Sequence, residues 1–237
     1  MAITTSAVTT YNNAAAGASH TVSYTVSAGS NQVLVVRAGA RRGALNTTTQ
    51  TATYNGVSMT SGVTQVKDDA STNTYRVNIF YLANPASGTH DFVVTGNVSL
   101  LYAGAIQVLD GVDLVNLPGV NNTDTGTDAQ SDVALTSMTA DSYSVGIHVS
   151  SSSGAPTWTW TNVSEDFDFN GASGIAVSGA YYANASASSV TFTGTRSASA
   201  AYCAAALEFK ADATGQPMVA RARQVPGMRR RHGHQGW

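Results

Sequence analysis

The sequence is poor in charged residues, in long helix-forming side chains and in cysteine. Only 11% of its 237 residues are charged, against about 25% in an ordinary soluble domain. Long helices favour Glu and Lys, and only two residues of each type occur. The single cysteine, Cys203, excludes an intramolecular disulfide framework. It lies in an apolar run, which predicts a buried and unreactive thiol. These absences argue against a helical protein and against a disulfide-stabilised one.

Targeting and catalytic motifs are missing as well. No stretch approaches the roughly 20 apolar residues of a membrane-spanning helix, and residues 1–5 lack the basic region and apolar core of a secretory signal. We find no Gly-rich phosphate loop, CxxC pair, HExxH helix or GxSxG elbow. We therefore expect a protein without signal peptide or membrane partner, without catalytic residues and without a cofactor.

Hydroxyl and apolar residues take the place of charge, in the alternation that is typical of β-strands. The chain contains 29 Thr and 26 Ser, and 43% of its residues are hydrophobic. Apolar residues share one face of residues 20–26, 75–81 and 143–149, and most residues on the opposite face are polar. Residues 32–36 are apolar on both faces, as in a strand at the centre of a sheet. About a dozen such runs predict an all-β antiparallel sandwich or barrel.

Turn signals and a change of composition divide the chain. Asn55-Gly56 predicts a two-residue hairpin, and the segment 110–131, which lacks alternation, predicts a long surface loop. No exact internal repeat is visible. Residues 1–210 carry seven basic and thirteen acidic residues, a net of −6, whereas residues 211–237 carry five Arg and one Asp, a net of +4. We predict a β-sandwich domain over 1–210 and an extended basic C-terminal arm over 211–237.

Six segments of the chain form a pattern that is known from other proteins. They are Asn31–Val36, Tyr54–Thr60, Tyr81–His90, Ala103–Ile106, Gly111–Asp113 and Ala205–Lys210. Together they resemble a family of concanavalin-like or jelly-roll-like sandwich modules found in phage virion proteins and bacterial surface proteins. The resemblance covers roughly residues 18–210 and preserves the order of the segments. It implies a jelly-roll-like fold that acts as a binding or structural scaffold, with no catalytic residues to transfer.

Three groups of residues in the body have side chains that suit ligand chemistry. Asp124 and Asp128 lie in an oxygen-rich loop that could attract calcium, although a solvated turn is favoured. Trp158 and Trp160 share a strand face, as a sugar-binding platform would, although packing between sheets is favoured. Residues 165–170 predict a charged edge strand, with Asp166 and Asp168 on one face and two phenylalanines on the other.

The C-terminal arm predicts a contact with a partner. Its composition favours disorder in isolation, and such a segment becomes ordered when it docks on another molecule. Its arginines could neutralise packaged nucleic acid, but pairing with carboxylates of an adjacent subunit is favoured because the body is acidic. The expected partner-binding residues are Arg221, Arg223, Arg229, Arg230, Arg231 and Trp237.

These features lead to one functional expectation and one alternative. We expect a non-enzymatic virion structural protein, made in the host cytoplasm, that decorates a capsid or forms a minor component of the particle. Its expected partners are capsid or tail subunits and further copies of itself. The alternative is a lectin-like module of a tail fibre or surface protein that binds host glycans through Trp158 and Trp160.

Overall fold

The structure is a computed structural model that describes residues 2–45, 48–69, 72–152, 156–171 and 174–213. All regular structure in these ranges is β-strand, and every strand pair is antiparallel. The predicted all-β antiparallel sandwich is thereby confirmed. Within the same ranges, no helix is long and apolar enough to cross a membrane.

Seventeen strands make up the described chain. The first half contains β1 (Thr4–Thr5), β2 (Thr9–Asn12), β3 (Gly17–Val26), β4 (Val33–Arg42), β5 (Gln50–Tyr54), β6 (Val57–Ser58), β7 (Thr60–Asp68), β8 (Thr74–Ala83) and β9 (Gly88–Asp110). The second half contains β10 (Asn121–Gly126), β11 (Gln130–Met138), β12 (Tyr143–Ser151), β13 (Trp158–Thr161), β14 (Ser164–Asn170), β15 (Ile175–Ala183), β16 (Ser188–Arg196) and β17 (Tyr202–Phe209).

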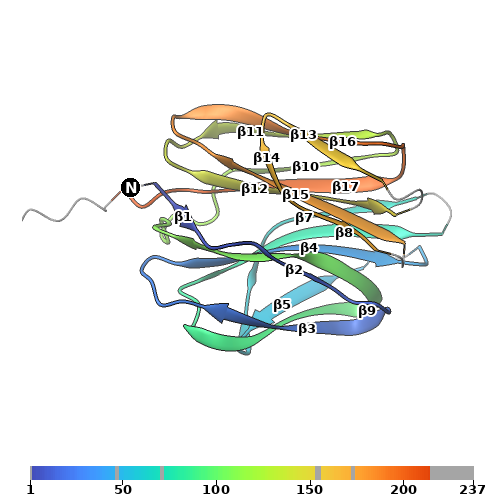
Figure 1. Cartoon of the computed structure of the whole chain (residues 1–237), viewed down its shortest axis with the longest axis horizontal. Helices are drawn as coiled ribbons and strands as arrows, with labels where there is room; N and C mark the ends of the chain where they lie inside the picture. The colour runs from blue at the N-terminus through green and yellow to red at the C-terminus, as the bar shows by residue number, and fades with distance from the viewer. Residues whose placement is uncertain (1, 46–47, 70–71, 153–155, 172–173, 214–237) are drawn as a thin grey trace, which may run out of the picture.

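The strands form four stacked layers (Figure 1). One outer layer consists of β3, β5, β6 and the first part of β9. The second part of β9 crosses into the next layer, where it pairs with β1, β2 and β4, and β8 and β7 follow. The third layer has the order β10-β17-β12-β15-β14, and the other outer layer has the order β11-β16-β13.

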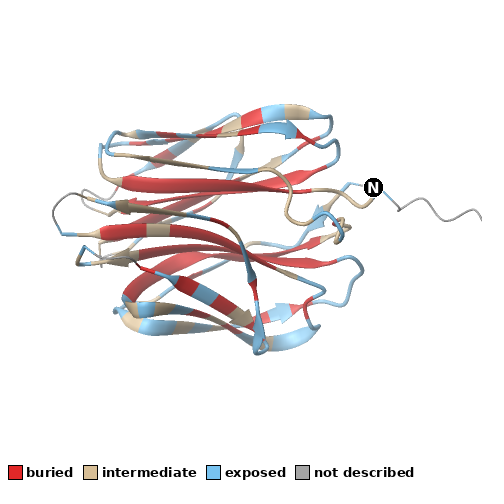
Figure 2. Cartoon of the chain, turned by 180° about the vertical axis from the view of Figure 1, so that it is seen from behind, coloured by how far each residue is buried: buried red, intermediate tan, exposed pale blue. Residues whose placement is uncertain are grey.

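Three apolar cores separate the four layers. The central core lies between the two inner sheets, and the other two lie beneath the outer sheets. Consequently the inner strands β4, β12 and β17 are buried almost throughout, whereas the outer strands alternate between buried and exposed residues (Figure 2). Cys203 lies in the central core, where burial raises the pKa of its thiol.

Of the two local predictions, the hairpin is present in the structure and the long loop is not. The hairpin at Asn55-Gly56 is confirmed: Tyr54 pairs with Val57, and both turn residues have positive φ, as a type I′ turn requires. The long loop predicted over residues 110–131 is wrong, because β10 occupies residues 121–126 and pairs with β17. β10 lies at a sheet edge and none of its residues is fully buried, so its sequence shows no apolar alternation.

The two halves of the chain repeat the same topology, which the sequence did not reveal. The order β2-β9-β4-β8-β7 in the first half matches β10-β17-β12-β15-β14 in the second. Likewise β3-β9-β5 matches β11-β16-β13. Each half is therefore a two-layer sandwich, and the two sandwiches pack through their inner sheets. The one long strand β9 takes the places of both β16 and β17.

The strand registers of the two sandwiches also coincide. Val33 of β4 pairs with Leu109, and Tyr143 of β12 pairs with Phe209, so β9 and β17 correspond with a shift of 100 positions (209 minus 109). The turns after β8 and β15 match at the same shift. The N–H of Asn84 donates to the Gln32 carbonyl, and the N–H of Asn184 donates to that of Ser142, both at 2.8 Å.

A bulge occurs at the same point in both sandwiches. The register shifts around Gly62 in β7 and around Asp166 in β14. β7 lies against β17 and β10 of the other sandwich, and β14 lies against β9. This reciprocal packing relates the halves by an approximate two-fold axis. The equivalent positions Gly39 and Val149 meet across it, since a Cβ on Gly39 would lie 2.6 Å from Cγ2 of Val149.

Candidate functional site

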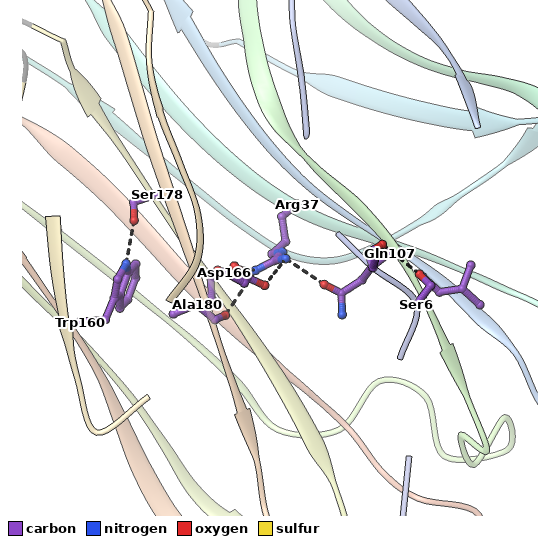
Figure 3. Close-up of polar contacts among 10 residues, drawn as sticks. Ser6, Arg37, Gln107, Trp160, Asp166, Ser178 and Ala180 are labelled. Atoms are coloured by element: carbon purple, nitrogen blue, oxygen red, sulfur yellow. Dashed lines mark hydrogen bonds and ion pairs between the residues drawn. The ribbon is translucent and has the colours of Figure 1, made fainter. Parts of the chain in front are cut away.

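Arg37, the largest fully buried side chain among the described residues, forms an ion pair between the two sandwiches. The Arg37 guanidinium of β4 donates to both carboxylate oxygens of Asp166, at 2.9 and 2.6 Å. It also donates to Oε1 of Gln107 at 2.8 Å (Figure 3). The guanidinium lies 4.8 Å from the centre of the Phe167 ring. The side chains of Arg37 and Asp166 are only 1% and 7% exposed. Their bidentate geometry suits a structural link between the halves.

The bulge in β14 overturns the prediction that Asp166 and Asp168 share a face. Asp166 and Phe167 both point into the interface with the first sandwich. Asp168 instead faces the outer sheet, where it bonds with Ser178. Burial raises the pKa of Asp168, and burial together with the nearby Asp168 carboxylate raises the pKa of Glu165. Asp166 is thus buried by the other sandwich, whereas the sequence predicted a solvent-facing charge.

His148 and Ser131 form a buried pair in the second sandwich. Nδ1 of His148 lies 2.9 Å from Oγ of Ser131, and each residue is 1% exposed. The imidazole is enclosed by the rings of Trp158 and Tyr202, at centroid distances of 4.1 and 4.8 Å. Burial, reinforced by Arg196, lowers the pKa of His148 well below 6.5. The pair resembles a nucleophile and its base, but its burial gives it the geometry of a core contact.

His148 should make the stability of the protein depend on pH. The unfolded chain takes up a proton below about pH 6.5, while the folded protein does so only at a much lower pH. The free energy of unfolding should therefore fall by up to about 1.4 kcal/mol for each pH unit below 6.5. Urea unfolding of the unsubstituted protein and of His148→Gln at pH 7, 6 and 5 measures this slope. Identical slopes in the two proteins would contradict the assignment.

The two tryptophans considered for sugar binding lie beneath the outer sheet. Trp158 is 7% exposed and packs edge-on against His148. Trp160 is partly exposed, and its Nε1 donates to Oγ of Ser178 at 2.7 Å (Figure 3). The pair therefore packs between the sheets and offers no exposed double-ring platform.

The two aspartates considered as calcium ligands interact with neighbouring residues of the same chain. Asp124 accepts hydrogen bonds from the hydroxyl of Tyr202 at 2.9 Å and from the N–H of Asp132 at 2.8 Å. Asp128 lies near the same tyrosine, whose pKa rises through burial and these two carboxylates. Across the described ranges, no three His, Cys, Asp or Glu side chains gather as metal ligands.

The first residues of the C-terminal arm are held on the body by backbone and side-chain hydrogen bonds. Ala211 pairs with Val112, and the N–H of Asp212 donates to the Gly111 carbonyl at 2.8 Å. The Asp212 carboxylate accepts from Nδ2 of Asn31 at 2.5 Å. The arm therefore leaves the body at a fixed point beside the loop that joins the two sandwiches.

This joining loop, residues 111–120, presents the apolar side chain of Val115 at a hollow that Asp113 and Asp212 also border. The Asp113 carboxylate accepts from the N–H groups of Val115 and Asn116, at 3.0 and 3.3 Å, and from Nδ2 of Asn116 at 2.6 Å. These bonds lower the pKa of Asp113. Val115 is 90% exposed, more than any other large hydrophobic residue described. Asp212, Ala213 and the loop border a hollow of about 480 Å³.

The partner-binding residues predicted from the sequence lie outside the described residues. They are Arg221, Arg223, Arg229, Arg230, Arg231 and Trp237. The structure links some of the other candidates: His148 packs between Trp158 and Tyr202, and Tyr202 donates to Asp124. Trp160 and Asp168 both form hydrogen bonds with Ser178. Sequence reasoning missed Arg37 and Val115. A cationic residue inside the apolar run 33–40 was the available signal for a buried ion pair.

The chain was compared with protein families, curated proteins and solved structures. No protein-family model, curated protein or solved structure matches the chain.

Proposed function

We propose that this chain is a non-catalytic structural protein of a bacteriophage particle, held to a neighbouring subunit by its C-terminal arm. The observation that carries the proposal is the exit of a basic arm from an acidic body at a fixed point. Residues 1–210 have a net charge of −6 and residues 211–237 a net charge of +4. Opposite charges on the body and the arm favour electrostatic contact between adjacent subunits.

The construction of the body supports a scaffold role. Two sandwiches share a continuous core, and the best-buried polar groups, such as the Arg37–Asp166 pair and the His148–Ser131 pair, bind to one another. The exposed faces of the outer strands carry mainly hydroxyl side chains. A rigid body of this kind can present an arm without a change of shape.

Incorporation into particles tests the proposal. Phage particles assembled with the variant R229Q/R230Q/R231Q should contain at least tenfold less of the protein than particles assembled with the unsubstituted chain. The variant loses three of the five arm arginines, and hence the pairing with neighbouring carboxylates. Quantitative mass spectrometry of purified particles measures the amount. Lys67→Gln, which removes a cation from the body, is the control and should be incorporated normally. Normal incorporation of the arginine variant would contradict the proposal.

A further inference from the structure

The hollow at the arm exit has the features of a docking site for a peptide. It is bordered by Asn31, the loop residues 113–116, and Asp212 with Ala213. Hydrogen bonds to Asp113 hold the loop in a defined turn, so Val115 is displayed without further ordering of the loop. An apolar side chain that is 90% exposed beside two carboxylates suits a partner with both apolar and cationic groups.

The arm itself has this composition. Residues 214–237 contain five arginines and no acidic residue, whereas residues 1–213 contain seven basic and fourteen acidic residues. Apolar residues alternate with the arginine groups along the arm. They are Met218, Val219, Val225, Met228 and Trp237. Arginine forms bidentate pairs with carboxylates, and the apolar residues could cover Val115.

We propose that this hollow binds the C-terminal arm of a second copy of the chain. The inference rests on the proposed function, in which the arm holds a neighbouring subunit, and it identifies that subunit as another copy. Asp212 and Ala213 of a chain already border its own hollow, so its own arm starts at the edge of the site. The arginine cluster begins sixteen residues later (229 minus 213). Sixteen extended residues span about 54 Å. This exceeds the length of a ten-residue strand such as β4, roughly 33 Å, so the arginine cluster can reach the hollow of a neighbouring copy.

Such a contact joins unlike surfaces, since the arm of one copy meets the hollow of the next. Heterologous contacts of this kind generate closed rings or open arrays rather than simple two-fold dimers. A protein assembled in this way should grow beyond a dimer as its concentration rises. The contact should also weaken with salt, because it pairs arginines with carboxylates at the protein surface.

Light scattering of the full-length protein over a range of concentrations tests the inference. The unsubstituted protein should associate, and Val115→Asp and R229E/R230E/R231E should each raise the apparent dissociation constant at least tenfold. Leu45→Asp, which changes a half-exposed residue at the opposite end of β4, is the matched control and should associate normally. Combining Asp212→Lys with R229E/R230E/R231E should recover part of the association by reversing both charges.

The outcomes separate this inference from the proposed function. A protein that stays monomeric at all concentrations overturns the inference, and so does association that Val115→Asp leaves unchanged. A monomer whose melting temperature falls on Val115→Asp would place the chain's own arm in the hollow, which also overturns it. Particle incorporation without self-association would leave the proposed function intact. Self-association without incorporation would instead overturn the proposed function.

Discussion

Replacement of Asp166 by alanine is expected to lower the free energy of unfolding by about 3–5 kcal/mol, because it leaves a buried cation without its partner. The Arg37 side chain is 1% exposed, and Asp166 supplies both oxygens of its bidentate contact. The remaining acceptors near the guanidinium are Oε1 of Gln107 at 2.8 Å and the backbone carbonyls of Gly146 and Ala180, at 3.4 and 3.3 Å. Urea unfolding measures the loss. Asp91→Ala, at an exposed position of β9, should stay within about 0.5 kcal/mol of the unsubstituted protein.

The approximate two-fold axis indicates how this loss can be reversed. Arg37, Gln107 and Asp166 correspond by strand register to Ile147, Leu207 and Gly62 on the other side of the interface. The equivalent positions thus hold polar side chains on one side of the axis, and two apolar residues with a glycine on the other, where a Cβ on Gly62 would lie 2.6 Å from Cδ2 of Leu207. The triple variant R37I/Q107L/D166G should return to within about 1 kcal/mol of the unsubstituted protein, or exceed it. A triple variant as unstable as Asp166→Ala would contradict this equivalence.

Substitution of Gly39 by valine is expected to destabilise the protein by about 3 kcal/mol through overpacking between the sandwiches. A Cβ at this position would lie 2.6 Å from Cγ2 of Val149, 2.9 Å from Cγ2 of Val177 and 3.0 Å from the Ala103 carbonyl oxygen. Both valines belong to the central core. The control Gly43→Ala places a methyl group in open space and should change stability by well under 1 kcal/mol.

A size exchange tests whether Gly39 and Val149 face each other across the axis. Val149→Gly alone should be destabilising, since it leaves a cavity in the central core. The double variant G39V/V149G moves the same side chain to the other side of the axis. It should be more stable than the sum of the single effects by at least about 1.5 kcal/mol, as expected for residues in contact. Additive effects would show that the two positions do not share the space.

The strands were predictable because their signals are local. Alternation in residues 20–26 and 143–149 reflects the pleat of one strand, and Asn55-Gly56 encodes a turn through its own backbone preferences. β10 was missed because an edge strand needs backbone pairing but no buried side-chain face. The repeat was missed because two sandwiches can share topology and register while filling their interface with different side chains.

For the candidate site residues, too, the sequence predicted the type of side chain but not its contacts in the folded protein. Loop residues such as Asp124 can be recognised as oxygen-rich, but the carboxylate's hydrogen bonds to Tyr202 and Asp132 come from strands brought together by the fold. The faces of Asp166 and Asp168 could not be read from alternation, because a bulge reverses the pattern between them. The role of Val115 could not be predicted, because it depends on the hollow that Val115 shares with Asp212, which is distant in sequence.

By itself, the sequence determined an all-β body with little charge, a buried cysteine and a basic C-terminal arm, since composition and short-range periodicity depend on single strands and segments. Only the tertiary structure decided that the body is two equivalent sandwiches, that Arg37 and Asp166 join them, and that the arm leaves beside an exposed apolar loop. These features depend on pairings between distant segments. Their energy comes from burial and from contacts that form only when the sheets stack.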